Sequence, residues 1–280
     1  MLLLTSRVTS GTEAMPDNNE EILKSLEDVL DRRAPIDGLG ALTSAISHKA
    51  SLDKALKTTA IGLDANVFLR LAKHSRIEDI VDYLNATHAA PLIMPGQAIQ
   101  EFWNNQLSAV DTVSASLKKK FEALKAETAK IDENFVEFSD RFEAVLTDFN
   151  SEYGYIYDES TVRFTLSLLN VLEKRAEVCY VPRLRFQAIA ENRKLTKTPP
   201  GFKDDGHGDF YIWAEFIFGL LRAKKDGRTF DHAVLVTNDQ KIDWSRGGVA
   251  HPILTAEVMR ATGASFEVWS LERLWKAINA

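Results

Sequence analysis

The feature that most constrains the fold of this sequence is an alternation of short apolar runs with segments of helical periodicity. Apolar runs of strand length occupy Ala60–Leu63, Pro91–Pro95 and Ala233–Thr237, and a further strand and helix are expected from Phe266 onward. Helical patterns lie between these runs. Such alternation is typical of βαβ units, in which helices join parallel strands. The sequence therefore predicts an α/β fold with a parallel sheet flanked by helices.

Composition narrows the class of protein. With 280 residues, 45% of them apolar and 26% charged, the chain has the make-up of an ordinary globular protein. Cys179 is the single cysteine and has no disulfide partner, so we expect a packed core thiol and a cytoplasmic location. No apolar stretch reaches the roughly 20 residues that a bilayer requires. A net charge of −6 gives no general attraction to nucleic acid, so any such binding needs local patches or metals.

Two regions are expected along the chain. Residues 1–59 form a flexible leader followed by an N-terminal helical extension, in which Ile22, Leu26 and Leu30 share one helical face. Residues 60–280 form one sheet domain.

A long helical insertion is expected to interrupt that domain at about residues 103–180. Apolar residues there alternate in steps of four and three, which is a heptad pattern. The positions are Trp103, Leu107, Val110, Ser114, Leu117, Phe121, Leu124, Thr128, Ile131, Phe135, Phe138, Phe142, Val145 and Phe149, and the pattern is broken only by Ser114 and Thr128. Phe164, Leu168 and Val171 resume the pattern on a returning segment, which favours a hairpin closed within the chain. The alternative is a coiled-coil contact with a second copy or a regulatory partner.

Four acidic residues are placed where they can converge. Asp64 and Asp239 each follow an apolar strand, Glu101 lies one turn into a helix after Pro95, and Asp209 opens another helix. In open α/β sheets, ligands bind beyond the carboxyl ends of the strands. Taken singly, each acid also fits a helix cap, a turn or an exposed helix surface. Their joint placement favours a shared site.

The chemistry of such a cluster points to hard cations. Four carboxylates repel one another unless cations neutralise them. Mg²⁺ or Mn²⁺, as one or two ions, fits an all-oxygen set better than zinc does, because no histidine or cysteine accompanies the acids. Two such ions promote phosphodiester hydrolysis without a covalent nucleophile.

Several segments resemble the PIN-like nucleases, and within them the larger group with a helical insertion. They are Ile61–Asn66, Gln97–Phe102, Pro199–Asp204, Gly208–Trp213 and Val236–Trp244, the last two being the most specific. The resemblance runs from about Ala60 to the C-terminus. It implies a Rossmann-type PIN-like fold and Mg²⁺- or Mn²⁺-dependent hydrolysis of single-stranded nucleic acid, most often RNA.

By position, Asp64, Glu101, Asp209 and Asp239 match the acidic quartet of that family and are expected to be both catalytic and metal-binding. Ala65 stands where threonine or serine is common in the family. Further residues are expected to orient ligands or water, or to contact substrate: Asn66, Thr237, Lys241 and Asp243. Asp204 and Asp205 are rival ligands ranked below Asp209.

A basic stretch precedes the third acidic segment and is the candidate for contacts with the nucleic-acid backbone, since such contacts are mainly electrostatic. Its members are Arg183, Arg185, Arg193, Lys194, Lys197 and Lys203. Phe186 and Phe202 are candidates for base stacking, although packing is the simpler role for both.

The leading hypothesis is an endoribonuclease, such as a toxin or defence effector held in check by a partner. A non-catalytic scaffold that recruits partners through the heptad helices is the alternative, and a DNA nuclease ranks lower. A phosphatase with an aspartyl nucleophile is disfavoured, because Asn66 stands where such enzymes have a second aspartate.

Overall fold

The computed structural model of the protein describes residues 17–47, 55–68, 76–107, 159–239 and 241–279, with isolated positions between 120 and 147. The predicted leader over residues 1–15 and most of the heptad pattern between Trp103 and Phe149 lie outside these residues. Whether the heptad helices close on themselves or on a partner therefore stays a prediction.

Five parallel strands form the central sheet, which confirms the fold class predicted from the apolar runs. The strand order is β3-β2-β1-β4-β7. Every residue of β1, β2 and β4 is buried, which is why these strands are continuous apolar runs without alternation. The bounds are β1 (Thr59–Leu63), β2 (Leu92–Pro95), β3 (Glu177–Cys179), β4 (His232–Val236) and β7 (Ser265–Trp269).

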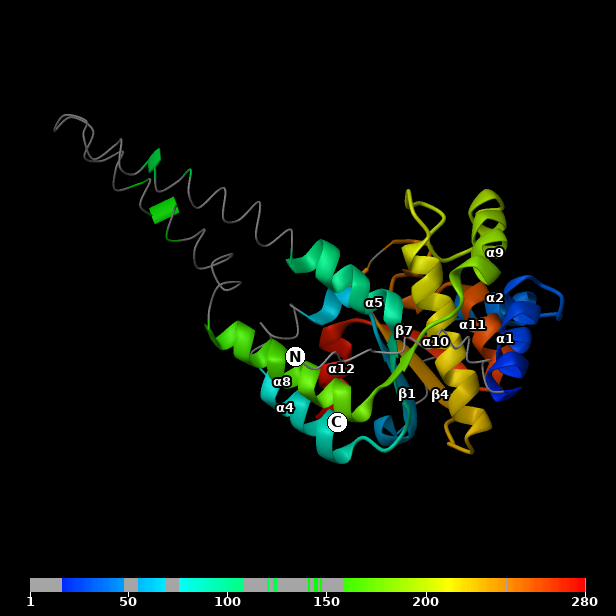
Figure 1. Ribbon diagram of the computed structural model, residues 1–280, viewed down its shortest axis with the longest axis horizontal. Coiled ribbons are helices and arrows are strands. Elements are labelled where there is room, and N and C mark those ends of the chain that lie inside the picture. The colour runs from blue at the N-terminus through cyan, green and yellow to red at the C-terminus, as the bar shows by residue number, and fades with distance from the viewer. Residues whose placement is uncertain are drawn as a thin grey trace, which may run out of the picture.

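Helices cover both faces of the sheet (Figure 1). Helices α10 and α11 lie on one side together with α1, α2 and α9, and α4, α8 and α12 lie on the other. The bounds are α1 (Asp17–Leu30), α2 (Gly38–Ile46), α4 (Ile77–Asp82), α5 (Gly96–Glu101), α8 (Glu159–Arg175), α9 (Arg183–Leu195), α10 (Gly208–Lys225), α11 (Pro252–Thr262) and α12 (Leu271–Ile278). A two-stranded ribbon joins β5 (Ser245–Arg246) to β6 (Val249–Ala250), and short helical turns occupy η1 (Leu56–Thr58), η2 (Ala65–Val67), η3 (Tyr83–Thr87) and η4 (Phe102–Leu107).

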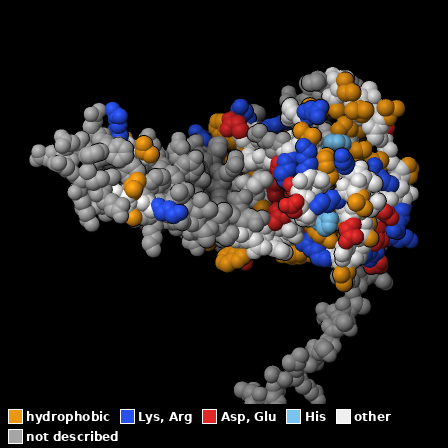
Figure 2. All heavy atoms as spheres, turned by 90° about the horizontal axis from the view of Figure 1, so that it is seen from above, with side chains coloured by type: hydrophobic (Ala, Val, Ile, Leu, Met, Phe, Trp, Pro, Cys, Tyr) orange, Lys and Arg blue, Asp and Glu red, His pale blue; other side chains and the backbone are white. Residues whose placement is uncertain are grey.

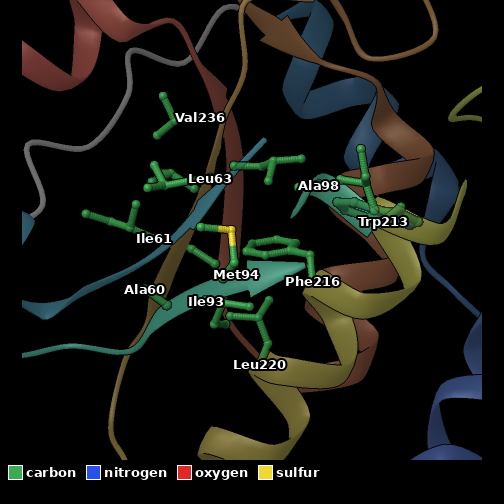
Figure 3. Close-up of a cluster of buried hydrophobic side chains, with 14 of the residues drawn as sticks. Ala60, Ile61, Leu63, Ile93, Met94, Ala98, Trp213, Phe216, Leu220 and Val236 are labelled. Atoms are coloured by element: carbon green, nitrogen blue, oxygen red, sulfur yellow. The ribbon is translucent and has the colours of Figure 1, made fainter. Parts of the chain in front are cut away.

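The core lies between the sheet and α10. Phe216 and Leu220 of this helix point toward Ile93 and Met94 of β2 (Figure 3). Cys179 is buried at the same layer, as predicted for a packed thiol. Although α10 is apolar, no helix in the described part of the chain combines the length and hydropathy needed to cross a bilayer.

The N-terminal helices pack directly on the sheet domain. Helix α1 buries Leu23, Leu26 and Leu30, and it contacts both α10 and α11, while α2 contacts α11. The predicted amphipathic face of residues 22–30 is therefore a face of the main core.

The predicted insertion at about residues 103–180 overlaps two elements of the sheet domain. Helix α8 buries Leu168 and Val171, and it contacts α4 and β2. Residues 177–179 form the edge strand β3, which pairs with β2. The sequence does not predict this strand, because three residues of which only Cys179 is buried give no apolar run. The helical segment thus ends at Arg175, earlier than expected.

A buried ion pair ties four helical segments together. The Glu257 carboxylate is fully buried in α11 and accepts hydrogen bonds from Arg193 Nη1 (2.8 Å) and Nη2 (3.1 Å) of α9. It also accepts from Arg32 Nη2 (3.0 Å), just after α1, and from Trp213 Nε1 (2.8 Å) of α10. A buried carboxylate with four donors is well satisfied, but removing one donor leaves a charge that water cannot reach.

We expect Arg193→Met to lower the free energy of unfolding by about 3–5 kcal/mol, because Glu257 then loses its bidentate partner inside the core. Urea denaturation measures this loss. Arg32→Met is the matched control: the Arg32 side chain is 36% exposed, so its loss should cost about 1 kcal/mol or less. Equal losses from both variants would contradict the assignment of Arg193 as the main partner.

Candidate active site at the carboxyl edge of the sheet

The ends of β1 and β4 bring the first site residues together. These strands pair in parallel with Leu63 opposite Val236, so Asp64 and Thr237 each follow by one residue. The Thr237 hydroxyl donates to Asp64 Oδ2 at 2.7 Å, and the backbone N–H of Asp64 donates to the Val236 carbonyl at 3.0 Å. The parallel register thus fixes the Asp64 carboxylate, which is only 5% exposed.

Asn66 links the same two strand ends from the η2 turn. Its amide nitrogen donates to Asp64 Oδ2 at 2.8 Å and to Thr237 Oγ1 at 3.0 Å. Its carbonyl oxygen accepts from the backbone N–H of Asn238 at 2.8 Å. The predicted orienting roles of Asn66 and Thr237 thus correspond to direct contacts with Asp64.

Lys241 places a positive charge among acidic side chains near the carboxyl ends of the strands. Its ammonium lies 2.8 Å from Asp204 Oδ2, 2.9 Å from Asp239 Oδ2 and 3.4 Å from Asp209 Oδ2. Its backbone N–H also donates to Asp239 Oδ1 at 2.8 Å. Within the described residues, no three His, Cys, Asp or Glu side chains form a ready metal-binding group. The charge that balances these carboxylates in this structure is the Lys241 ammonium.

Glu101 reaches the cluster from α5. Its Oε1 accepts from Gln97 Nε2 at 2.9 Å. A Cβ atom at Gly208 would come within 2.1 Å of the same oxygen, so any other residue at this position would require the Glu101 carboxylate to move. This contact explains one of the two glycines that bracket His207 in the sequence.

Glu215 holds the helix that carries Glu101. The carboxylate is fully buried in α10 and accepts from the backbone N–H of Gln97 (2.7 Å), at the start of α5, and from that of Val181 (3.4 Å). Arg183 Nη2 lies 3.1 Å from Glu215 Oε1. The sequence gives no signal for this role, since Glu215 stands alone inside an apolar helix.

Asp243 and Trp244 support the loop before α10. Asp243 is fully buried, and its Oδ2 accepts from the backbone N–H of Gly201 at 2.9 Å. Trp244 Nε1 donates to Asp209 Oδ2 at 3.0 Å. The contact of Asp243 is thus with the loop that carries Asp204.

Burial and repulsion between neighbouring carboxylates raise the pKa of several acids in the site. Burial raises the pKa of Asp64 to about 6, and the nearby charges of Glu101 and Asp239 add to this, against the hydrogen bond from Thr237. Burial also raises the pKa of Asp209 to about 8, with Asp204 as the next cause. Burial raises the pKa of Glu101. All three shifts mean that placing a negative charge here is costly.

Lys241 responds in the opposite direction. Partial burial lowers the pKa of its ammonium, but hydrogen bonds to Asp204 and Asp239 outweigh that effect and raise the pKa above its usual range. The ammonium therefore stays charged. Asp204 lies among these acids, whereas Asp205 is exposed. Of these two alternative ligands, the structure therefore places Asp204 in the cluster and Asp205 outside it.

The arginines of the predicted basic surface form ion pairs within the protein. Arg193 is 3% exposed and bound to Glu257, so its predicted contact with a nucleic-acid backbone is wrong. Arg185 pairs with Glu27 (2.7 Å) and Glu20 (2.8 Å) of α1. These pairs form because α9 packs beside acidic α1, which a linear basic run does not reveal. Acidic and basic side chains accordingly lie beside one another on the surface (Figure 2).

The remaining members of the basic stretch are partly available. Arg183 pairs with Glu215, and Lys194 Nζ donates to the backbone oxygen of Asp205 at 2.6 Å. Lys197 and Lys203 are exposed. Of the two candidate stacking residues, Phe186 is fully buried and Phe202 is half-buried, so only Phe202 can meet a ligand.

We expect Asp64→Asn to stabilise the protein in a chelating buffer at about pH 8 and to have little effect near pH 4. Because the folded protein holds the pKa at about 6 rather than 3.8, the charged form costs stability as pH rises through this interval. Asparagine removes that cost, worth about 3 kcal/mol at most, and still accepts from Thr237. Thermal unfolding at the two pH values tests this. A gain of equal size at both would contradict it, and exposed Asp205→Asn is the control.

One comparison with known proteins gives a match. The family model described as a PIN like domain matches residues 60–154, which include Asp64 and Glu101 and end before Asp209 and Asp239. No curated protein and no solved structure matches the chain. The match covers about a third of the chain and, together with the parallel sheet flanked by helices, supports a PIN-like domain in this protein; such domains are generally nucleases.

Proposed function

We propose that this protein is a metal-dependent nuclease that hydrolyses phosphodiester bonds of single-stranded nucleic acid, with RNA as the first substrate to test. The observation that carries the proposal is the convergence of five carboxylates at one edge of the sheet. They come from β1, α5, the loop before α10, α10 itself and the segment after β4, and they are Asp64, Glu101, Asp204, Asp209 and Asp239.

The residues fit a divalent cation. All the donors are oxygens, which suit Mg²⁺ or Mn²⁺, and the cluster already accommodates one positive charge, the Lys241 ammonium. Asp64, Glu101, Asp209 and Asp239 would hold one or two such ions. When bound, these ions supply an activated water and stabilise the leaving oxygen of a phosphodiester.

The other residues of the site act by orienting these acids. Thr237 and Asn66 hold Asp64 Oδ2, and Trp244 holds Asp209 Oδ2, so the orientation of both carboxylates is fixed. Glu215 fixes the start of α5 and thereby the position of Glu101. Preorganised groups of this kind favour catalysis, because little rearrangement is needed during the reaction.

Cleavage of pooled single-stranded RNA in Mg²⁺ or Mn²⁺ tests the proposal. We expect Asp64→Asn and Asp239→Asn each to lower the rate roughly 100-fold or more, the scale of losing a well-placed catalytic group. Product formation is followed on denaturing gels, with single-stranded DNA of the same sequences run in parallel.

Asp205→Asn is the matched control, because Asp205 is exposed in the same loop as Asp204 and is not part of the cluster. It should cleave like the unaltered protein. Cleavage that persists in Asp64→Asn and Asp239→Asn, or that is unaffected by a chelator, would sink the proposal.

Lys241→Met provides a test that does not depend on cleavage. Without the ammonium, Asp204, Asp209 and Asp239 lose their counter-charge, so we expect a lower melting temperature in chelator. Mn²⁺ should then raise the melting temperature of Lys241→Met more than that of the unaltered protein. If Mn²⁺ raises the melting temperature of neither protein, no cation binds among these carboxylates.

A further inference from the structure

Two cavities share part of their lining, and the first of them includes Asp239 of the acidic cluster. The first, of about 470 Å³, is lined by the site residues Thr237, Asn238 and Asp239 and extends to Trp269 and Arg273. The second, of about 690 Å³, is mainly apolar and is lined by residues that include Leu42, Ile46 and Phe202. Ile242, Arg246 and Gly247 line both. The two cavities are therefore neighbours, and these three residues form part of the wall of each.

Arg246 stands at the junction of these cavities. It ends β5, opposite Val249 of β6, and a turn of two glycines with positive φ, Gly247 (58°) and Gly248 (80°), joins the two strands. This tight turn places the guanidinium at the surface, where Arg246 is exposed. Among the residues that the structure describes, its guanidinium forms no ion pair, unlike Arg183, Arg185 and Arg193.

We propose that the two cavities form one groove for a single-stranded nucleic acid, in which Arg246 contacts a backbone phosphate next to the acidic cluster. A base of the neighbouring nucleotide lies in the apolar cavity against Phe202 and Ile242. This inference rests on the proposed nuclease function and names how that site holds its substrate.

Charge argues for this path. The chain carries a net charge of −6, and its acidic cluster repels a polyanion, so a strand needs a local cation to approach. Arg246 supplies one in the same cavity as Asp239, whereas the three arginines of the predicted basic stretch lie in internal ion pairs.

The apolar cavity suits an unstacked base. Leu42 and Ile242 are each 44% exposed, which leaves apolar surface uncovered beside the turn. Phe202 adds an aromatic ring, and aromatic rings bind bases of any sequence through stacking. The volume of the apolar cavity lies within the range of pockets that hold small organic groups.

Binding is measured by fluorescence anisotropy with a labelled single-stranded oligoribonucleotide and the matching oligodeoxyribonucleotide. The Asp64→Asn protein serves as background, so that cleavage is too slow to disturb the binding measurement. We expect Arg246→Glu to raise Kd roughly 10-fold or more. It should also reduce the slope of log Kd against log salt concentration by about 1, which corresponds to the loss of one phosphate contact. Phe202→Ala should raise Kd roughly 5-fold or more.

Arg246→Lys and Arg260→Glu complete the series. Lysine retains the charge, so Arg246→Lys should keep most of the affinity. Arg260 is exposed on α11 and lines neither cavity, so Arg260→Glu should bind like the background protein. Melting temperatures confirm that each variant is folded. Tighter binding of RNA or of DNA identifies the sugar and supports the groove in either case.

The outcomes separate this inference from the proposed function. If the background protein binds and Arg246→Glu binds equally well, the groove is wrong while cleavage by the unaltered protein still supports the nuclease. If binding depends on Arg246 and the unaltered protein cleaves neither nucleic acid, the groove holds and the nuclease proposal fails. No binding by any variant overturns the groove.

Discussion

The pairing of β1 with β4 is the interaction on which the site depends. With Leu63 opposite Val236, the residues that follow both strands leave the sheet at one edge, and Thr237 and Asn66 can bridge to Asp64. A shift of one residue in that register would turn each strand's side chains to the opposite faces of the sheet. The buried apolar strands that give the domain its stability thus also set the geometry of its most polar region.

Buried acidic side chains have two different kinds of surroundings in this protein. Glu257 is surrounded by donors from three other segments, so it binds helices together and has no capacity left for a ligand. The acidic cluster has more carboxylates than Lys241 can balance, and burial, with the neighbouring acids as a further cause, raises the pKa values of Asp64 and Asp209. This surplus of oxygen ligands is what supports the proposal that the site takes up a divalent cation.

The sequence predicted the parallel sheet because long buried strands leave continuous apolar runs, and it placed Asp64 and Asp239 because both follow such runs. It did not predict β3, which is too short to leave a pattern. It also did not predict the role of Glu215, because a lone acid in an apolar helix has no partner visible in the sequence. The basic stretch was misjudged for the same reason: the partners of Arg185 and Arg193 lie 158 and 64 residues away.

By itself, the sequence determined the fold class and which acids can meet, because strand ends and helix starts are local features with local signals. Only the tertiary structure decided which charged side chains are held in ion pairs and which remain exposed to a ligand. Arg193 is enclosed by α1, α10 and α11, Lys241 lies between three carboxylates, and Arg246 is left exposed between two cavities. The reason is physical: an ion pair depends on distance in space, and the packing of helices on both faces of the sheet sets those distances.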